Sequence, residues 1–117
     1  MLTIRQEQMK VFSQLEVERF EDWMLAHLKK FFPANCRSAG EPKLRDIIRR
    51  GFERATAYRF TAMRDVCKYI DLMVVFGREF DTDKRLPWAG KILDSRGSPE
   101  QKMQDLYAAA HRHLTRS

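Results

Sequence analysis

Apolar residues recur along this chain at intervals of three and four, the period of an amphipathic α-helix. The first stripe predicts a long helix from about Ile4 to Pro33, and Thr3 and Gln6 have the spacing of a capping box that would begin it. Its apolar face is rich in aromatic rings, so Phe20 and Trp23 are expected to anchor the helix to the core. The stripe consists of Phe12, Leu15, Phe20, Trp23, Met24, Leu28 and Phe31.

Two further stripes predict helices in the middle of the chain. Residues 33–40, PANCRSAG, collect Pro, Asn, Ser and Gly and are expected to form a loop. A second helix begins near Pro42, and its apolar face includes Gly51. A glycine inside a helix costs about 1 kcal/mol relative to alanine, so Gly51 indicates close approach by another helix. The third helix is expected to run from a Thr61 cap to Phe76 and to end at Gly77.

The C-terminal part adds a short helix over Pro87–Leu93 and a long one that begins at Ser98-Pro99, an N-cap serine followed by proline. No segment alternates with the period of two that a half-buried strand requires. The sequence therefore predicts an all-α fold, a compact bundle of four main helices plus one short helix. At 117 residues and 44% apolar content, it is expected to form a single helical domain over residues 1–117.

The N-terminal residues MLTIRQEQMK carry charges where a signal peptide needs an apolar segment, and no apolar run approaches the roughly 20 residues that cross a bilayer. Cys36 and Cys67 are far apart and follow no metal or redox spacing. These features predict a cytoplasmic protein with reduced thiols and no contact with membranes.

Candidate catalytic groups are few. His111 and His113 are two residues apart and cannot chelate from one helix face, and His27 is expected to be a half-buried structural imidazole. Asp81 and Asp83 resemble the start of a calcium loop, but Arg85 stands where a third oxygen ligand is needed. No nucleophile, phosphate-binding or dinucleotide motif is present. The sequence therefore predicts a protein that is not an enzyme and holds no metal or cofactor.

The net charge of +6 comes mainly from the stretch Lys43 to Arg64, whereas the middle of the first helix is acidic. A solvated or protein-docking face is favoured over a nucleic-acid surface for the basic stretch, because it lacks a recognition-helix signature. The two charged regions could pair within the fold or join two copies as a homodimer. The candidate partner-binding residues are Lys43, Arg45, Arg49, Arg50, Arg54, Glu18, Glu21 and Asp22, together with Asp81 and Asp83.

The segment FGREFDTDKRLPWAG, residues 76–90, is expected to be a well-anchored loop. Phe80 and Trp88 would pin it to the core, while Asp81 and Asp83 would make turns, cap the following helix or pair with the basic residues Lys84 and Arg85. If Trp88 were exposed instead, the loop would become a docking candidate.

Several blocks of the sequence resemble small helical proteins that bacterial type VI secretion effector clusters encode beside effector-chaperone genes. The resemblance covers most of the chain from the first helix to Ala89. The blocks are Arg19-Phe20-Glu21 with Met24, His27-Leu28 and Phe32-Pro33, then residues 64–73 (RDVCKYIDLM), then Phe80-Asp81-Thr82-Asp83 and Leu86-Pro87-Trp88-Ala89.

This resemblance implies a cytoplasmic accessory protein that binds a secretion effector, its chaperone or both. An immunity protein that binds and neutralises a cognate toxin is the alternative from the same genetic surroundings. A small basic nucleic-acid-binding regulator is the second alternative, suggested by charge alone.

Overall fold

The structure, a computed structural model, describes residues 14–116, and this range is helical apart from its connections. The helices are α2 (Gln14–Phe31), α3 (Pro33–Ala39), α4 (Glu41–Ala57), α5 (Met63–Phe76), α6 (Pro87–Leu93) and α7 (Pro99–Arg116). The predicted all-α fold is confirmed, with α2, α4, α5 and α7 as its main helices. The predicted start near Ile4 and the Thr3 cap lie outside the described residues.

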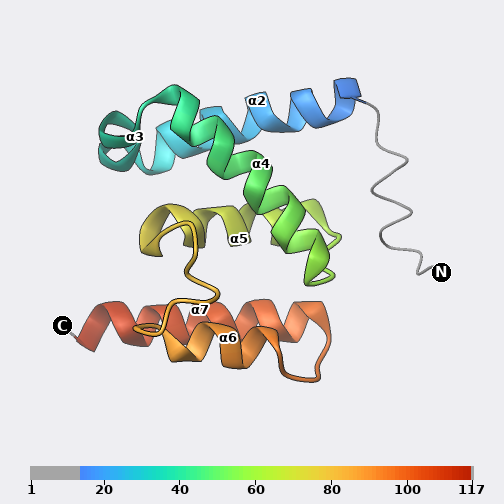
Figure 1. The fold of residues 1–117 in the computed structure, drawn as a ribbon, viewed down its shortest axis with the longest axis vertical. Helices are drawn as coiled ribbons and strands as arrows, with labels where there is room; N and C mark the ends of the chain where they lie inside the picture. Colours follow the sequence, from blue (N-terminus) through green and yellow to red (C-terminus); the bar gives the residue numbers. More distant parts are fainter. Residues whose placement is uncertain (1–13, 117) are drawn as a thin grey trace.

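Figure 1 shows α2, α5 and α7 one above another, with α4 crossing obliquely from α2 to α5 and α6 lying against α7. The most extensive contact is between α4 and α5, followed by α6 on α7 and α4 on α2. The molecule is only 20 Å deep, about two helix diameters. Because direct contact between α2 and α5 is slight, α4 is the element that joins them.

The contact between α4 and α5 depends on Gly51. A Cβ atom built on Gly51 would lie 2.5 Å from Cγ1 of Ile70 and 2.9 Å from Sδ of Met73. Ile70 and Met73 are buried side chains of α5. The expected close approach of another helix at this glycine is therefore confirmed, and the partner helix is α5.

A cluster of aromatic rings fills the core beneath α4 and α5. Tyr69 is fully buried and contacts Tyr58, Phe60 and Phe80, with ring centroids 5.1 to 6.1 Å apart. Phe80 belongs to the connection between α5 and α6, so this cluster ties that connection to the core, as predicted. Trp88 of α6 packs edge-on against Phe76 at 5.5 Å and also contacts His113 of α7.

Local signals predicted most helix ends correctly. The backbone N–H of Gly77 donates to the carbonyl of Met73, and the Gly77 φ of 114° suits a residue without a side chain. Ser98 Oγ accepts from the N–H of Gln101 at 3.1 Å, as an N-cap does. The N-cap position of α5 is occupied by Ala62, one residue after the expected Thr61, and Ala62 makes no side-chain capping bond.

Residues 33–40 were expected to be a loop, but residues 33–39 form α3. Pro33 occupies the first turn of this helix, where its missing N–H costs nothing, and Gly40 follows the last turn with φ 85°. Cys36 is buried from this helix into the core. The residues that suggested a loop are therefore the two ends of a short helix.

None of the helices in residues 14–116 combines the length and the apolar character needed to cross a membrane.

Candidate functional site

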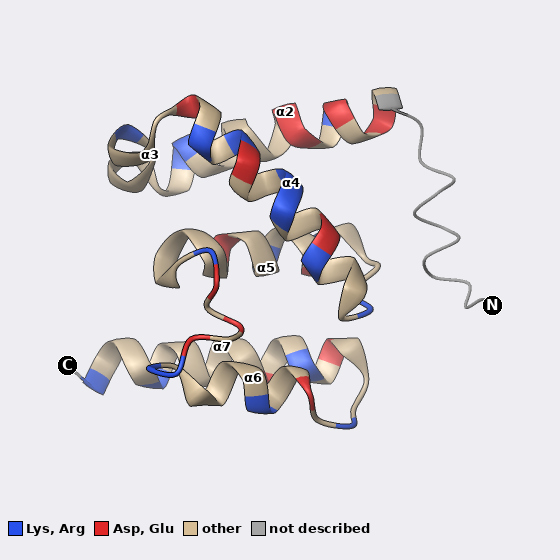
Figure 2. Ribbon diagram, viewed as in Figure 1, with Lys and Arg blue, Asp and Glu red and all other residues tan. Residues whose placement is uncertain are grey.

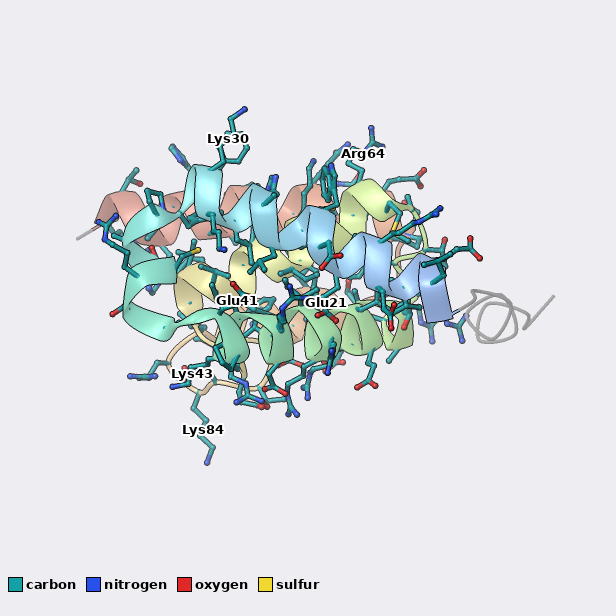
Figure 3. The ribbon with its side chains drawn as sticks, turned by 90° about the horizontal axis from the view of Figure 1, so that it is seen from above. Glu21, Lys30, Glu41, Lys43, Arg64 and Lys84 are labelled. Atoms are coloured by element: carbon teal, nitrogen blue, oxygen red, sulfur yellow. The ribbon has the colours of Figure 1, made fainter. Side chains whose placement is uncertain are left out.

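Glu21 is the acidic residue around which α2 and α4 meet (Figure 3). Its carboxylate accepts from Arg45 Nη1 at 2.5 Å and from Arg49 Nε at 2.7 Å, and Glu21 itself is only 4% exposed. Burial works to raise the pKa of Glu21, but the hydrogen bonds from Arg49 and Arg45 outweigh it and hold the pKa below its usual value. Asp22 extends the cluster by accepting from Arg45 at 3.1 Å.

A second buried cluster ties α4 to the loop that follows α5. One carboxylate oxygen of Asp81, Oδ2, accepts from Arg54 through Nε at 3.0 Å and through Nη2, and from the hydroxyl of Tyr58 at 2.8 Å. Burial, together with the hydrogen bond to Asp81, raises the pKa of Tyr58 to about 12. Nearby, Arg50 donates to Glu79 at 2.5 Å.

Many of the charged residues that the sequence marked as candidate partner-binding residues thus form ion pairs with one another. Figure 2 shows basic and acidic segments alternating along α4, beside the acidic half of α2. Of the two fates expected for these regions, pairing within the fold is the one observed for Arg45 and Arg49. Glu21 and Asp81 are buried inside the fold, so neither carboxylate is free on the surface. Glu18 and Lys43 remain exposed.

Asp83 behaves differently from Asp81. Its carboxylate accepts the backbone N–H of Arg85 at 2.9 Å and the guanidinium of the same residue at 2.9 Å, which forms the expected turn. Neither aspartate caps α6, because Leu86 occupies the N-cap without a side-chain bond. Within residues 14–116, no group of three or more His, Cys, Asp or Glu side chains is placed to hold a metal ion.

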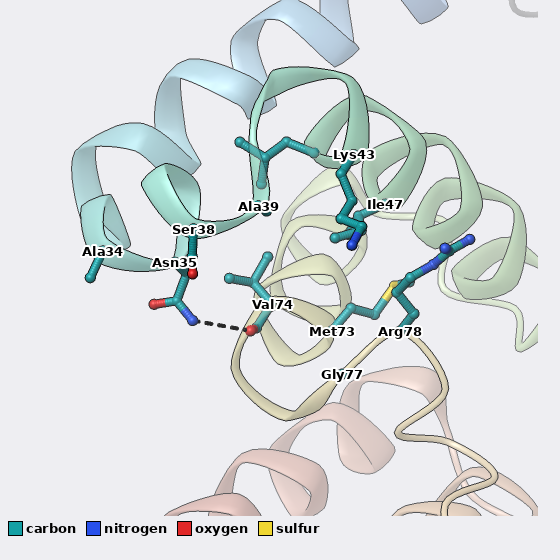
Figure 4. A pocket seen from close by; sticks show the side chains of 11 residues that line it. Ala34, Asn35, Ser38, Ala39, Lys43, Ile47, Met73, Val74, Gly77 and Arg78 are labelled. Carbon is teal, nitrogen blue, oxygen red and sulfur yellow. Dashed lines mark hydrogen bonds between the residues drawn. The ribbon is translucent and has the colours of Figure 1, made fainter.

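Lys43 lines a hollow of about 540 Å³ between α3, α4 and the end of α5 (Figure 4). Asn35 closes one side by donating to the carbonyl of Val74 at 3.4 Å. Arg78, on the opposite side, is paired with Asp46 at 2.6 Å. The walls include no aromatic residue, so this hollow offers no aromatic side chain to anchor a protein partner.

A larger groove of about 720 Å³ lies between α2, α5 and α7. It is found where α2 and α5 make only slight direct contact, and none of its lining residues belongs to α4. Its apolar residues are unusually open to solvent: the exposed fraction is 56% for Trp23, 39% for Met63 and 36% for Tyr107. The groove is lined by Arg19, Phe20, Trp23, His27, Met63, Arg64, Cys67, Lys68, Asp71 and Tyr107.

His27 and Asp71 form the polar part of the groove. Nε2 of His27 lies 3.2 Å from both carboxylate oxygens of Asp71 and donates to them. Burial raises the pKa of Asp71, and the hydrogen bond from His27 opposes this effect. The neighbouring thiol of Cys67 is not activated, because burial and the Asp71 charge raise its pKa to about 11. The expectation of a half-buried, structural His27 fits this arrangement.

The expectation that Trp23 anchors the core is wrong. Met24, the next residue, is fully buried, and Trp23 is turned about 100° away from it on the helix. Trp23 instead begins a second aromatic stripe at intervals of four, stacking on His27 at 5.5 Å, which in turn contacts Phe31 at 4.9 Å. Phe20 is partly buried and packs against the core, as expected of an anchor.

Sequence reasoning missed most of the groove. The residues not recognised as a set include Arg19, Met63, Arg64, Lys68 and Tyr107. One signal was available: the first helix carries more aromatic residues than one buried face can hold, and the spacing of Trp23, His27 and Phe31 follows its own face. The sequence carries no comparable pattern for the groove residues that α5 and α7 supply.

Comparisons of this chain with protein-family models, with curated proteins and with solved structures find no match.

Proposed function

We propose that this protein is a non-enzymatic, protein-binding accessory, an adaptor or co-chaperone for a type VI secretion effector or for the chaperone of that effector. The observation that carries the proposal is the open aromatic groove between α2, α5 and α7. Exposed aromatic and methionine side chains gathered in one hollow are typical of surfaces that bind another protein. The sequence resemblance to secretion-cluster accessory proteins supplies the class of partner.

The distribution of charge favours a protein partner over nucleic acid. A nucleic-acid surface needs cations that are free to meet phosphates. Arg45, Arg49 and Arg54 are instead held by carboxylates of the same chain. This pairing removes much of the basic stretch that suggested a regulator.

Co-expression of the tagged full chain with the effector and the chaperone of its gene cluster tests the proposal. A stable complex with either product, isolated by size-exclusion chromatography, is the expected result. Absence of any complex with both products would contradict the adaptor role. A complex with the toxin domain alone, coupled with toxin sensitivity of the deletion strain, would instead support the immunity alternative.

The same complex can be tested for its dependence on the groove. Trp23→Ala should weaken it because Trp23 offers its exposed face to a partner. Trp88→Phe, which leaves the groove untouched, serves as the matched control. Equal weakening by both substitutions would place the contact elsewhere on the molecule.

A further inference from the structure

The rim of the groove carries positive charge that forms no ion pair with a described residue. Within residues 14–116 the arginines of α4 form ion pairs, whereas Arg19 and Arg64 form none with a described residue. Both are exposed, and Lys68 joins them from the next turn of α5. Figure 3 shows Arg64 on the side of the molecule opposite Lys43 and Lys84. These cations form a separate basic rim.

The groove contains little negative charge to balance this rim. Among the residues that the structure describes, Asp71 is the only acidic one in its lining, and Nε2 of His27 lies 3.2 Å from both of its carboxylate oxygens. The ammonium of Lys68 lies 5.4 Å from the centre of the Tyr107 ring, beside the apolar wall. An occupant of this groove therefore meets an apolar floor and a cationic edge at the same time.

The groove is long enough for several turns of a helix. A smaller hollow lined by Glu16, Val17, Arg19, Phe52 and Met63 shares Arg19 and Met63 with it, so the two adjoin, and Glu16 adds a carboxylate at that far end. From Glu16 to His27 the α2 wall rises by about 16 Å, at 1.5 Å per residue. This length matches about three helical turns of a ligand.

A helix also suits the chemistry of the walls better than an extended segment does. An extended peptide would bring unpaired backbone N–H and C=O groups against Phe20 and Met63, whose side chains offer no hydrogen-bond donor or strong acceptor. A helix satisfies its own backbone and presents side chains at intervals of three and four.

We propose that the groove binds an acidic amphipathic helix of the partner protein. This inference rests on the proposed adaptor function and specifies its ligand. Apolar side chains of that helix lie on Trp23, Met63 and Tyr107, and its flanking carboxylates face Arg19, Arg64 and Lys68. Apolar contact supplies most of the affinity, and the rim selects the sign of the partner's charge.

Trp23 provides a built-in reporter for the test. Trp23 and Trp88 are the only tryptophans of the chain, so Trp88→Phe leaves a single tryptophan, in the groove. Two synthetic helical peptides without tryptophan are compared, with identical leucines at one face and with either glutamate or lysine at the flanking positions. The glutamate peptide should shift Trp23 emission to shorter wavelength and bind at least about tenfold more tightly, with an affinity that falls as salt rises.

Charge reversal of the rim should reverse this preference. In the Trp88→Phe background, the double variant Arg64→Glu and Lys68→Glu should bind the lysine peptide more tightly than the glutamate peptide. The control double variant Lys91→Glu and Arg96→Glu reverses charges at exposed positions of α6 and the following turn, and it should still prefer the glutamate peptide. Circular dichroism verifies that each variant is folded, and Arg19→Glu provides a second rim variant if the double reversal unfolds the chain. Equal binding of the two peptides by the unaltered rim would overturn the inference.

Other anions distinguish a protein ligand from a general anion site. Single-stranded DNA and vesicles containing phosphatidylserine should leave the Trp23 emission unchanged at concentrations where the glutamate peptide saturates. The same emission shift with either of them would reassign the groove to nucleic acid or to a membrane surface.

The proposed adaptor function and the proposed helical ligand of the groove can be refuted independently of each other. A native complex that survives the rim reversal would refute the groove ligand and leave the adaptor role standing. Selective binding of the glutamate peptide, without any complex with the effector or its chaperone, would refute the adaptor role and leave the groove ligand standing.

Discussion

Two aspartates that are two positions apart have opposite surroundings, and their substitutions should show it. Asp81→Ala removes the acceptor that holds Arg54 and Tyr58 and leaves the partly buried guanidinium with only the longer ion pair to Glu79, at 3.7 Å. Breaking such a pair should lower the free energy of unfolding by about 3 kcal/mol. Urea unfolding followed by far-UV circular dichroism measures this loss.

Asp83→Ala is the matched control for Asp81→Ala. Asp83 pairs with the highly exposed Arg85, and such exposed pairs contribute about 0 to 1 kcal/mol. A loss as large as that of Asp81→Ala would mean that the Asp83 turn, rather than the buried cluster, holds the loop to α4.

The two tryptophans should also differ in their effect on stability. Trp88 packs against Phe76 and His113 between α5, α6 and α7, so Trp88→Ala should lower the free energy of unfolding by about 3 kcal/mol. Trp23→Ala removes a largely exposed ring and should cost less than about 1 kcal/mol. Equal stability of the Trp88→Ala protein and the parent would show that Trp88 does not fasten α6 to the core.

The roles of single residues were therefore only partly predictable. Phe80 and Trp88 were expected to hold the loop because large rings beside turn residues usually pack inward. The partner of Asp81 was not predictable, since Arg54 is 27 residues away and Lys84 and Arg85 are closer along the chain. Only the tertiary fold decides which cation reaches a given carboxylate.

At the scale of elements, the contact between α4 and α5 makes Gly51 the most constrained glycine. Gly51→Ala would place a methyl group 2.5 Å from Cγ1 of the fully buried Ile70. Overpacking costs about 1 to 3 kcal/mol, and the better helix propensity of alanine returns about 1 kcal/mol. We expect a net loss of about 1 kcal/mol in the free energy of unfolding, measured by urea denaturation.

Gly97→Ala is the control for Gly51→Ala, because a Cβ at Gly97 meets no atom within 4 Å. This substitution should be neutral or stabilise slightly by restricting the unfolded chain. A stabilising Gly51→Ala would show that α4 and α5 can separate without loss, contrary to the close contact described above.

Element boundaries followed the sequence where one local signal sufficed. Gly77 and Ser98 each act through their own backbone or side chain, so their positions were readable. The short helix α3 was not, because Pro33 and Gly40 are typical both of loops and of helix ends. Burial of Cys36 against the rest of the fold is what favours the helix, and that contact has no local signature.

At the scale of the whole molecule, the basic residues fall into two groups, one that forms ion pairs within the fold and one that lines the groove. The arginines of α4 hold α2 and the loop in place, and the cations beside the groove remain available for a partner. The total charge was readable from composition, but this division was not, because it depends on which helices α4 contacts. The groove likewise arises where α2 and α5 make only slight contact, chiefly through His27 and Asp71, a consequence of tertiary packing that no helical stripe predicts on its own.

The junction of α2 and α4 should make the fold sensitive to acid. The folded-state pKa of Glu21 lies below its ordinary value, so its carboxylate stabilises the fold above the unfolded pKa and loses this effect as pH falls through the folded pKa. Glu21→Gln should therefore cost about 2 kcal/mol at neutral pH. The difference from the parent should shrink progressively below about pH 4, and urea midpoints measured across this range test the prediction.

Glu53→Gln, at an exposed position of α4, is the control and should leave the urea midpoint with the same dependence on acidic pH as in the parent. A difference between Glu21→Gln and the parent that stays constant with pH would mean that the shape of Glu21, and not its charge, joins the two helices.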